Sequence, residues 1–268
     1  MINTKKLKPI ETSDLIRTGR ANDGGYVIPK KVFSISDGLL SYGINKDWSF
    51  EKDFWKKNPN AIIHCYDHNV SFLKLIFFTI KSLLLSVVRL FLLDRKRFVK
   101  EFSGIFVIPD YFYFFKNNRV YFKNRIWFNN EQNSKTIEDT LIEIHSSGAK
   151  SIFLKMDIET AEYKVLEDIF KTQNHICGMA IEFHKIDEYS KEFNLLIDKI
   201  LEKFYIVHAH GNNYGKLFGK NNFPSIIELT FINKDHIIEP VKFSKKSYPI
   251  DGLDQPNRFS KSDCKLIF

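Results

Sequence analysis

The chain has 268 residues, of which 44% are hydrophobic and 27% are charged. This length and composition exclude a disordered or collagen-like chain and predict a globular protein that can bury a full core without disulfide staples. The formal net charge of +8 comes without a long basic block, a zinc finger or an RNP-type strand, which argues against nucleic acid and leaves either solvated lysines or a basic mouth for a phosphorylated substrate.

Seven short apolar runs, rich in β-branched and aromatic residues, predict strands. They occupy residues 39–44, 61–66, 119–128, 151–156, 178–183, 204–209 and 226–232. Helical patterns lie between several of them, at residues 136–145, 160–170 and 190–203. Thr136 with Asp139 predicts a capping box at the start of the first of these helices. The alternation predicts a Rossmann-like α/β fold, with a seven-stranded, mostly parallel sheet covered by helices on both faces.

The last two predicted strands are joined by a loop rather than by a helix. This loop, between residues 204–209 and 226–232, carries Gly211, Gly215 and Pro224. A connection without a helix is typical of antiparallel neighbours. We therefore expect an antiparallel last pair, with a reversed strand at the end of the sheet.

A long apolar segment interrupts the alternation between the second and third strands. In residues 73–93 the polar side chains fall within an arc of about 160°, which also holds some apolar ones, and the opposite side is wholly apolar. Lys74, Lys81 and Arg89 lie in this segment, and each would be costly inside a bilayer-spanning helix. We expect an amphipathic helix that packs on the domain or on a second subunit, and attachment to a membrane surface is the alternative.

The stretch that follows this helix is rich in aromatic residues, among them Phe98, Phe102 and Phe106. We therefore expect residues 72–118 to form a helical, aromatic-rich insertion between the second and third strands. The whole chain, residues 1–268, is then a single domain.

The ends of the predicted strands carry the first chemical signal, because open α/β sheets bind ligands beyond the carboxyl ends of their strands. Gly43 ends the first strand and would let a ligand approach the backbone closely. Asp67 follows the second strand and can accept hydrogen bonds from both hydroxyls of a ribose. An ordinary turn at Gly43 and a helix cap at Asp67 are the alternatives. Together the two residues favour an adenosine-type cofactor, and without a G-x-G-x-x-G string a dinucleotide is poorly supported.

Several short strings of the chain resemble one known family. They are G-R-A-N-D-G-G-Y-V at residues 19–27, L-S-Y-G-I at 40–44, S-F-E at 49–51, L-K-M-D-I-E at 154–159, A-E-Y at 161–163 and I-E-F-H at 181–184. These strings resemble the FkbM-type S-adenosylmethionine-dependent methyltransferases. Thr160 stands where the family usually has glycine after D-I-E, and the insertion is long. The resemblance implies O-methylation of sugars in capsule, polysaccharide, glycolipid or natural-product biosynthesis.

The resemblance also implies S-adenosylmethionine as the cofactor and a set of residues that would bind it. They are Gly24, Gly25, Tyr26, Tyr42, Gly43, Ser49, Phe50, Asp67 and Asp157. The glycine pair permits positive φ and exposed amides, so we expect the N-terminal turn to close over the methionine tail of the cofactor. A plain turn that leads into a peripheral strand is the alternative.

Methyl transfer to a sugar hydroxyl requires removal of the hydroxyl proton. His184 is the candidate catalytic base because imidazole titrates near neutral pH, and Asp157 is the catalytic residue expected beside the transferred methyl group. A structural histidine and a helix cap are the alternatives. We also expect Glu159 to belong to the site and Glu162 to be an ion-pair partner inside the fold.

A divalent metal would be a second way to activate the hydroxyl. The candidate ligands are Asp157, Glu182, His184 and His210, and carboxylates with imidazoles suit Mg²⁺, Mn²⁺ or Fe²⁺. Glu182 and His184 share one face of their strand, as do His208 and His210, which is the pattern that convergence requires. A metal-free base with hydrogen-bonding partners is the alternative.

These signals predict an S-adenosylmethionine-dependent O-methyltransferase that acts on a sugar or a nucleotide-activated sugar. The alternatives are a nucleotide-sugar transferase and a non-catalytic, membrane-associated protein that uses the helix at residues 73–93. Three scattered cysteines and a start without an apolar leader predict a cytoplasmic protein without a signal peptide. We expect no nucleic-acid partner, and peripheral membrane contact and a homo-oligomer stay open.

Overall fold

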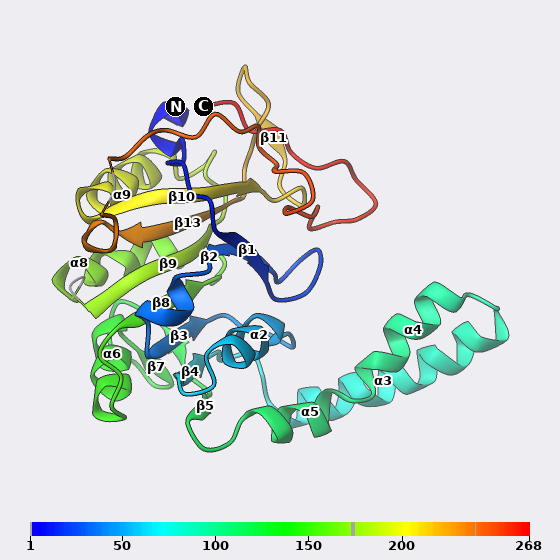
Figure 1. Cartoon of the computed structure of the whole chain (residues 1–268). Coiled ribbons are helices and arrows are strands. Elements are labelled where there is room, and N and C mark those ends of the chain that lie inside the picture. The colour runs from blue at the N-terminus through cyan, green and yellow to red at the C-terminus, as the bar shows by residue number, and fades with distance from the viewer. Residues whose placement is uncertain (1, 173–174, 239) are drawn as a thin grey trace.

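The computed structural model describes residues 2–172, 175–238 and 240–268. A seven-stranded sheet lies at the centre, with its strands in the order β10-β13-β9-β8-β3-β4-β5 (Figure 1). The strands are β3 (Gly38–Tyr42), β4 (Ile62–Tyr66), β5 (Arg119–Phe122), β8 (Ile152–Met156), β9 (Ile176–Phe183), β10 (Phe204–Gly211) and β13 (Ile227–Asn233). The ladder from β5 to β9 is parallel throughout, whereas β13 pairs antiparallel with both of its neighbours. The predicted fold class is confirmed.

The sequence predicted that the reversed strand would lie at the end of the sheet, but β13 does not lie there. It lies one place further in, between β9 and β10. In the register of the two ladders, His210 of β10 pairs with Glu228 of β13, and Glu228 pairs with Glu182 of β9. The strand of His210 is therefore separated from the strand of Glu182 by a whole strand, which affects the composition of the site below.

Helices cover both faces of the sheet, and β8 and β9 are therefore buried at every residue. The covering helices are α1 (Val32–Ile35), α2 (Ser49–Lys57), α6 (Ile137–Ser146), α7 (Glu162–Val165), α8 (Ile169–Thr172) and α9 (Ser190–Lys203). Successive residues of β3 supply two separate cores. Leu40 and Tyr42 pack with α6 and α9, and Leu39 packs with α1 and α2.

The starts of two helices follow from local sequence. The capping box of α6 is confirmed, since Thr136 Oγ1 accepts from the Asp139 amide at 3.1 Å and Asp139 Oδ2 accepts from the Thr136 amide at 2.8 Å. The helix predicted from residue 160 begins only at Glu162 and is divided by the 3-10 turn η2 (Leu166–Asp168). Thr160 has a φ of +77°, which no right-handed helix accommodates.

Short elements complete the fold around the sheet. They are η1 (Thr4–Leu7), β1 (Leu15–Thr18), β2 (Tyr26–Pro29), β6 (Arg125–Ile126), β7 (Ser134–Lys135), β11 (Leu217–Phe218), β12 (Phe223–Pro224) and η4 (Lys234–His236). The antiparallel pair β1–β2 holds the glycine-containing turn of the N-terminal region. This turn lies beside the loop that follows β3.

Between β4 and β5 the chain forms three helices, which are the expected aromatic-rich insertion. They are α3 (Phe72–Phe91), α4 (Arg95–Gly104) and α5 (Val107–Phe114). Helices α3 and α4 lie side by side and project away from the sheet (Figure 1), and we call this pair the arm. The sequence left three positions open for α3, on the domain, on a second subunit or on a membrane, and its apolar side does not pack on the domain: Phe77 and Leu84 are exposed, and Ser82 and Ser86 are buried. In the described part of the chain, no helix combines the length and the apolar character needed to cross a membrane.

Candidate functional site

Turns beyond the carboxyl ends of the strands hold residues in a conformation that side chains rarely adopt. Asn45, after β3, has a φ of +46°, and Lys185, after β9, has a φ of +49°. Glu159 and Thr160, after β8, have φ values of +55° and +77°. Such backbone strain costs about 1–3 kcal/mol per residue and gathers at functional sites. This edge of the sheet is therefore the candidate functional site.

Two carboxylates and an imidazole converge at this edge. Asp157 follows β8, Glu182 belongs to β9, and His184 follows β9. One ligand atom from each of the three lies within 4.8 Å of the other two. His184 Nε2 lies 3.6 Å from Asp157 Oδ1 and 4.0 Å from Glu182 Oε2. Three of the four predicted metal ligands are thus brought together.

Glu162 holds His184 in place from the other side. Glu162 Oε1 accepts a hydrogen bond from the His184 amide at 2.7 Å and lies 3.3 Å from His184 Nδ1. In this contact Nδ1 of His184 carries its hydrogen and donates it to Glu162 Oε1, and Nε2 faces Asp157 and Glu182. A carboxylate behind a histidine in this way is typical of metal-binding imidazoles. Glu162 is fully buried, and its Oε2 has no hydrogen-bond partner among the described residues.

Carboxylates outnumber the single imidazole in the cluster. Burial raises the pKa of Glu182 well above its ordinary value, and the charges of Asp157 and Glu228 raise it further. Burial alone would lower the pKa of His184, but the hydrogen bond to Glu162 and the charges of Glu182 and Asp157 outweigh it and raise that pKa to about 10. An imidazole that already holds its proton cannot accept one from a hydroxyl. A protonated His184 does not fit the predicted base role, and neither does an imidazole whose Nε2 binds a cation, because no nitrogen is then free to accept a proton; Nε2 instead suits a cation in place of its proton.

His210 is not part of this cluster, which corrects the predicted ligand set. Its Nδ1 lies 3.1 Å from Glu228 Oε2, and its Nε2 lies 3.0 Å from Asp263. Both ring nitrogens are therefore engaged by carboxylates. His208, on the same strand, pairs with Asp254. The physical reason is the inserted strand β13, which keeps β10 away from β9.

The two residues predicted to hold adenosine lie at adjacent strand ends. Asp67 accepts hydrogen bonds from the amides of Asn45 at 2.7 Å and Asn69 at 2.6 Å, so it fixes the loop after β3 and does not cap α3. Gly43 lies so close to Asp157 that a Cβ would fall 1.6 Å from the Asp157 carbonyl oxygen. Gly43, Asp67 and Asp157 therefore surround one loop. Each carboxylate oxygen of Asp67 keeps a further lone pair for a ligand.

The N-terminal turn packs on this same loop. Gly24 has a φ of +89°, and a Cβ on Gly25 would fall 2.1 Å from the Arg20 carbonyl oxygen, so both positions require glycine. Arg20 pairs with Asp47 at 2.7 Å, and its amide donates to Ser49 Oγ at 3.1 Å. The turn thereby lies beside the loop that carries Ser49.

Of three predicted aromatic contacts, only Tyr26 points to the site. Its hydroxyl donates to Asp157 Oδ2 at 3.5 Å. Tyr42 instead points into the core, where its hydroxyl bonds Thr140, and Phe50 packs its ring against Phe153. The rings of Tyr42 and Phe50 are buried on the helix-covered faces of the sheet, so any contact of these two residues with a cofactor would come from their backbone, and their role in cofactor binding stays a prediction.

Lys155 was not predicted as a site residue. It is buried in β8, and its Nζ donates to the Gly43 carbonyl at 2.7 Å. Burial would lower its pKa, but the charges of Asp157 and Glu51 raise the pKa above its ordinary value, so the lysine stays charged. A lysine inside an otherwise apolar strand was the sequence signal that could have revealed it.

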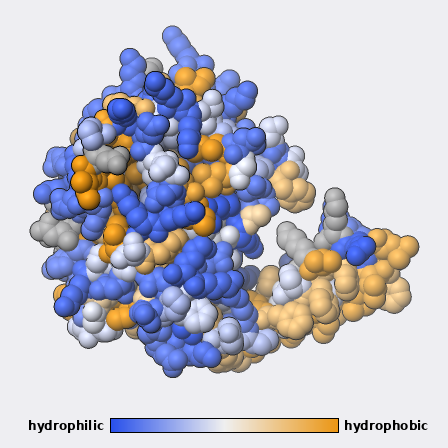
Figure 2. Space-filling view, viewed as in Figure 1, coloured by the Kyte–Doolittle hydropathy of each residue, from blue (hydrophilic) through white to orange (hydrophobic). Residues whose placement is uncertain are grey.

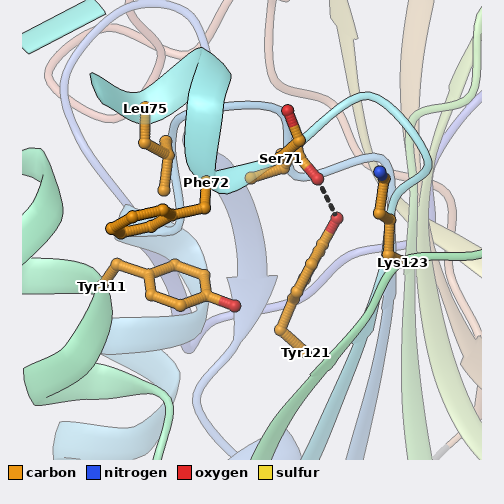
Figure 3. A pocket seen from close by; sticks show the side chains of 7 residues that line it. Ser71, Phe72, Leu75, Tyr111, Tyr121 and Lys123 are labelled. Carbon is orange, nitrogen blue, oxygen red and sulfur yellow. Dashed lines mark hydrogen bonds between the residues drawn. The ribbon is translucent and has the colours of Figure 1, made fainter. Parts of the chain in front are cut away.

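A cavity of about 150 Å³ opens beyond the ends of β4 and β5 (Figure 3). It is lined by Val70, Ser71, Phe72, Leu75, Tyr111, Tyr121 and Lys123. The Tyr121 hydroxyl donates to the Val70 carbonyl at 2.8 Å and also to the Asp67 carbonyl, so the cavity adjoins Asp67.

A second cavity, of about 290 Å³, lies beside the acidic cluster. It is lined by Arg125, Trp127, Glu159, Thr160, Ala161, Tyr163, Lys164, Tyr189 and Glu192. Tyr163 and Tyr189 stack with ring centroids 4.8 Å apart, and Arg125 lies over the ring of Trp127 at 3.6 Å. Glu159 connects this cavity to the cluster, since its Oε2 lies 3.9 Å from His184 Nε2.

No protein-family model matches the chain, and no curated protein is similar to it. The chain is similar to the Methanococcus jannaschii fibrillarin pre-rRNA processing protein, with 8% identity, a TM-score of 0.37, and coverage of 85% of this chain and 71% of that chain. It is also similar to precorrin-6y C5,15-methyltransferase from Geobacter metallireducens, with 9% identity, a TM-score of 0.35, and coverage of 76% and 87%.

A third similar structure is the plantazolicin methyltransferase BpumL in complex with SAH, with 8% identity, a TM-score of 0.30, and coverage of 74% of this chain and 76% of that chain. Likenesses at this level carry no argument about function. The sheet itself is Rossmann-like, mostly parallel with one reversed strand. The resemblance of the sequence to the FkbM type remains a prediction.

Proposed function

We propose that the protein is an S-adenosylmethionine-dependent O-methyltransferase of the FkbM type that methylates a hydroxyl of a sugar, either nucleotide-activated or a polysaccharide precursor. One observation carries the proposal. Gly43, Asp67 and Asp157 lie around a single loop at the ends of three adjacent parallel strands, next to the cluster of Glu182 and His184. This arrangement supports a methyl donor and an activated hydroxyl at neighbouring positions.

The donor would lie across the ends of β3 and β4. The free lone pairs of Asp67 suit the two ribose hydroxyls, and the aromatic cavity beside Asp67 suits the adenine ring (Figure 3). The turn at Gly24 and Gly25 packs on the same loop, and its amides suit the carboxylate of the methionine tail.

A divalent cation fits the cluster of Asp157, Glu182 and His184. Two carboxylates and one imidazole are suitable donors for Mg²⁺, Mn²⁺ or Fe²⁺, and the excess of negative charge favours a cation. When bound, the cation would lower the pKa of a sugar hydroxyl. Nε2 of His184 would face the cation while its Nδ1–H donates to Glu162. The exposed carboxylate of Glu159 would take the hydroxyl proton and release it to solvent.

The second cavity supports a nucleotide-activated acceptor. The aromatic side chains of Trp127, Tyr163 and Tyr189 line this cavity and suit apolar contact with a sugar or a base. Arg125 and Lys164 suit the negative charge of a diphosphate. Glu159 lies in the wall that this cavity shares with the metal-binding cluster, so a sugar there would lie close to the activating groups.

Calorimetry with S-adenosylhomocysteine tests the donor site. We expect binding by the purified protein and a loss of about tenfold or more in affinity for Asp67→Ala, because about 1.5–3 kcal/mol of charged hydrogen bonding is removed. Asp198→Ala, at an exposed ion pair on α9, is the matched control and should bind normally. Folded protein that binds UDP or GDP but no S-adenosylhomocysteine would favour a nucleotide-sugar transferase instead.

Chelation tests the cation separately. Dialysis against EDTA should abolish methyl transfer while S-adenosylhomocysteine still binds, and Mn²⁺ or Mg²⁺ should restore the activity. Unaltered turnover by protein that elemental analysis finds free of metal would reject the cation and leave the donor site standing.

A further inference from the structure

The contact between the two helices of the arm brings Gly104 of α4 against Ser82 and the edge of Phe78 of α3. Leu75, Ser82 and Ser86 are the buried residues of α3. Gly104 of α4 lies so close to this face that a Cβ there would fall 2.4 Å from Ser82 Oγ. Small residues at a helix contact let the backbones approach closely, and this pattern is typical of helix pairs that lie in lipid.

Large apolar side chains occupy the opposite face of α3. They recur at spacings of three and four residues, so they share one side of the helix. They are Leu73, Phe77, Ile80, Leu84, Val87 and Phe91. All six are exposed, and Phe77 and Phe91 expose 70% and 82% of their surface. A helix at the surface of a water-soluble domain normally buries such a face against the core, whereas α3 directs its apolar face away from the domain.

The apolar surface continues beyond α3. The turn at the tip of the arm exposes Leu92 and Leu93, the latter to 88%, and Phe102 on α4 and Phe112 on α5 are exposed as well. Figure 2 shows the projecting arm as mostly hydrophobic, while the visible face of the main body is mostly hydrophilic. A continuous apolar surface of this kind marks an interaction site.

The charge of the same region identifies the partner. Residues 72–118 contain eight Lys or Arg and only three Asp or Glu, so they supply five of the eight excess positive charges of the chain. Lys74 and Lys81 are exposed beside the apolar face, and Arg95 and Arg97 are exposed at the tip. An apolar face flanked by cations matches a surface of anionic lipid. A second copy of the chain would instead bring like charges together at the contact.

We propose that the arm attaches this protein to an anionic membrane surface. The outward face of α3 and the tip at Leu92 and Leu93 enter the boundary between headgroups and acyl chains. Lys74, Lys81, Arg95 and Arg97 lie at the level of the lipid phosphates. This attachment concerns the arm alone and does not depend on the chemistry at the sheet edge.

Co-sedimentation of the full chain with vesicles tests the proposal. We expect binding to vesicles of phosphatidylcholine with phosphatidylglycerol, weaker binding to pure phosphatidylcholine, and a decrease as salt is raised. The double variant Phe77→Glu with Leu84→Glu should lose at least about tenfold in partitioning, because each change removes an apolar contact and adds a negative charge. Leu195→Glu, at an exposed leucine of α9, is the matched control and should bind as the unchanged protein does.

Circular dichroism and thermal unfolding establish that each variant is folded; these positions are already exposed, so we expect native spectra. Folded, unchanged protein that sediments with neither vesicle would overturn the proposal. An equal loss for Leu195→Glu would also overturn it, since binding would then not belong to the arm. A dimer in light scattering that the double variant dissociates, without vesicle binding, would assign the face to a second copy.

Discussion

Thr160 shows strain concentrated at one residue. A β-branched side chain at a φ of +77° brings its Cβ too close to the backbone, whereas glycine adopts this conformation freely. The family that the sequence resembles usually has glycine at this position. The chain has threonine there, in the wall of the second cavity, so a molecule bound in that cavity would meet the hydroxyl or methyl group of Thr160.

Replacing Thr160 with glycine should therefore stabilise the protein. We expect Thr160→Gly to raise the free energy of unfolding by up to about 1 kcal/mol, since release of left-handed strain exceeds the added chain entropy of glycine. Thr160→Ala is the matched control, because alanine loses the same polar group but keeps the strained Cβ. Urea unfolding of the three proteins measures the effect, and equal stability of the Gly and Ala variants would contradict it.

His210 makes a second prediction at this scale, through pH. Burial alone would lower the pKa of His210, but Glu228 and Asp263 outweigh it and raise that pKa to about 10. The folded state thus holds a proton that the unfolded state releases near pH 6.5. The stabilisation is complete below about pH 6.5 and is lost as the pH rises toward 10.

Urea unfolding at several pH values measures this contribution by comparison with His210→Gln. The stability advantage of the unchanged protein over the variant should shrink by at least about 1 kcal/mol between pH 6 and pH 10. A constant difference across that range would show that His210 does not carry the extra proton.

At the scale of the elements, features that depend on neighbouring residues could be predicted from the sequence, and the order of the strands in the sheet could not. The strands and the capped start of α6 were predictable, because apolar runs and caps depend on neighbouring residues. The insertion of β13 between β9 and β10 was not, since any strand order satisfies the same local patterns. This one difference explains why Asp157, Glu182 and His184 were correctly grouped and His210 was not.

For a related reason the sequence left open which way the apolar face of α3 points. The sequence reveals that one side of the helix is apolar, but not which side meets the rest of the protein. Lys155 was overlooked because a lysine in a strand is normally taken as exposed, although here four carboxylates and a carbonyl oxygen compensate its burial.

The capping box of α6 gives the prediction at this scale. Thr136→Ala removes the side chain that accepts from the Asp139 amide, and should cost about 1 kcal/mol in the free energy of unfolding. Thr136→Ser keeps the hydroxyl and should cost much less. Thermal unfolding of both variants measures the difference, and equal losses would mean that the lost methyl group, not the cap, matters.

At the scale of the whole molecule, contacts between α5 and Trp48 link the arm to the candidate site, and we call these contacts the joint. Asp110 of α5 accepts hydrogen bonds from Trp48 Nε1 at 2.8 Å and from Lys52, and the indole of Trp48 packs against Tyr111 and Phe115. Trp48 belongs to the loop after β3 whose other residues pair with Asp67 and Arg20. Helix α5, which connects the arm to β5, is therefore fixed to the loop that we assign to the methyl donor.

The position of Trp48 makes this joint observable by fluorescence. Indole emission shifts with the polarity of its surroundings, and the chain has three tryptophans, at positions 48, 55 and 127. With Trp55 and Trp127 replaced by phenylalanine, the spectrum of the remaining indole would report whether a vesicle at the far end of the arm alters the loop beside Asp67.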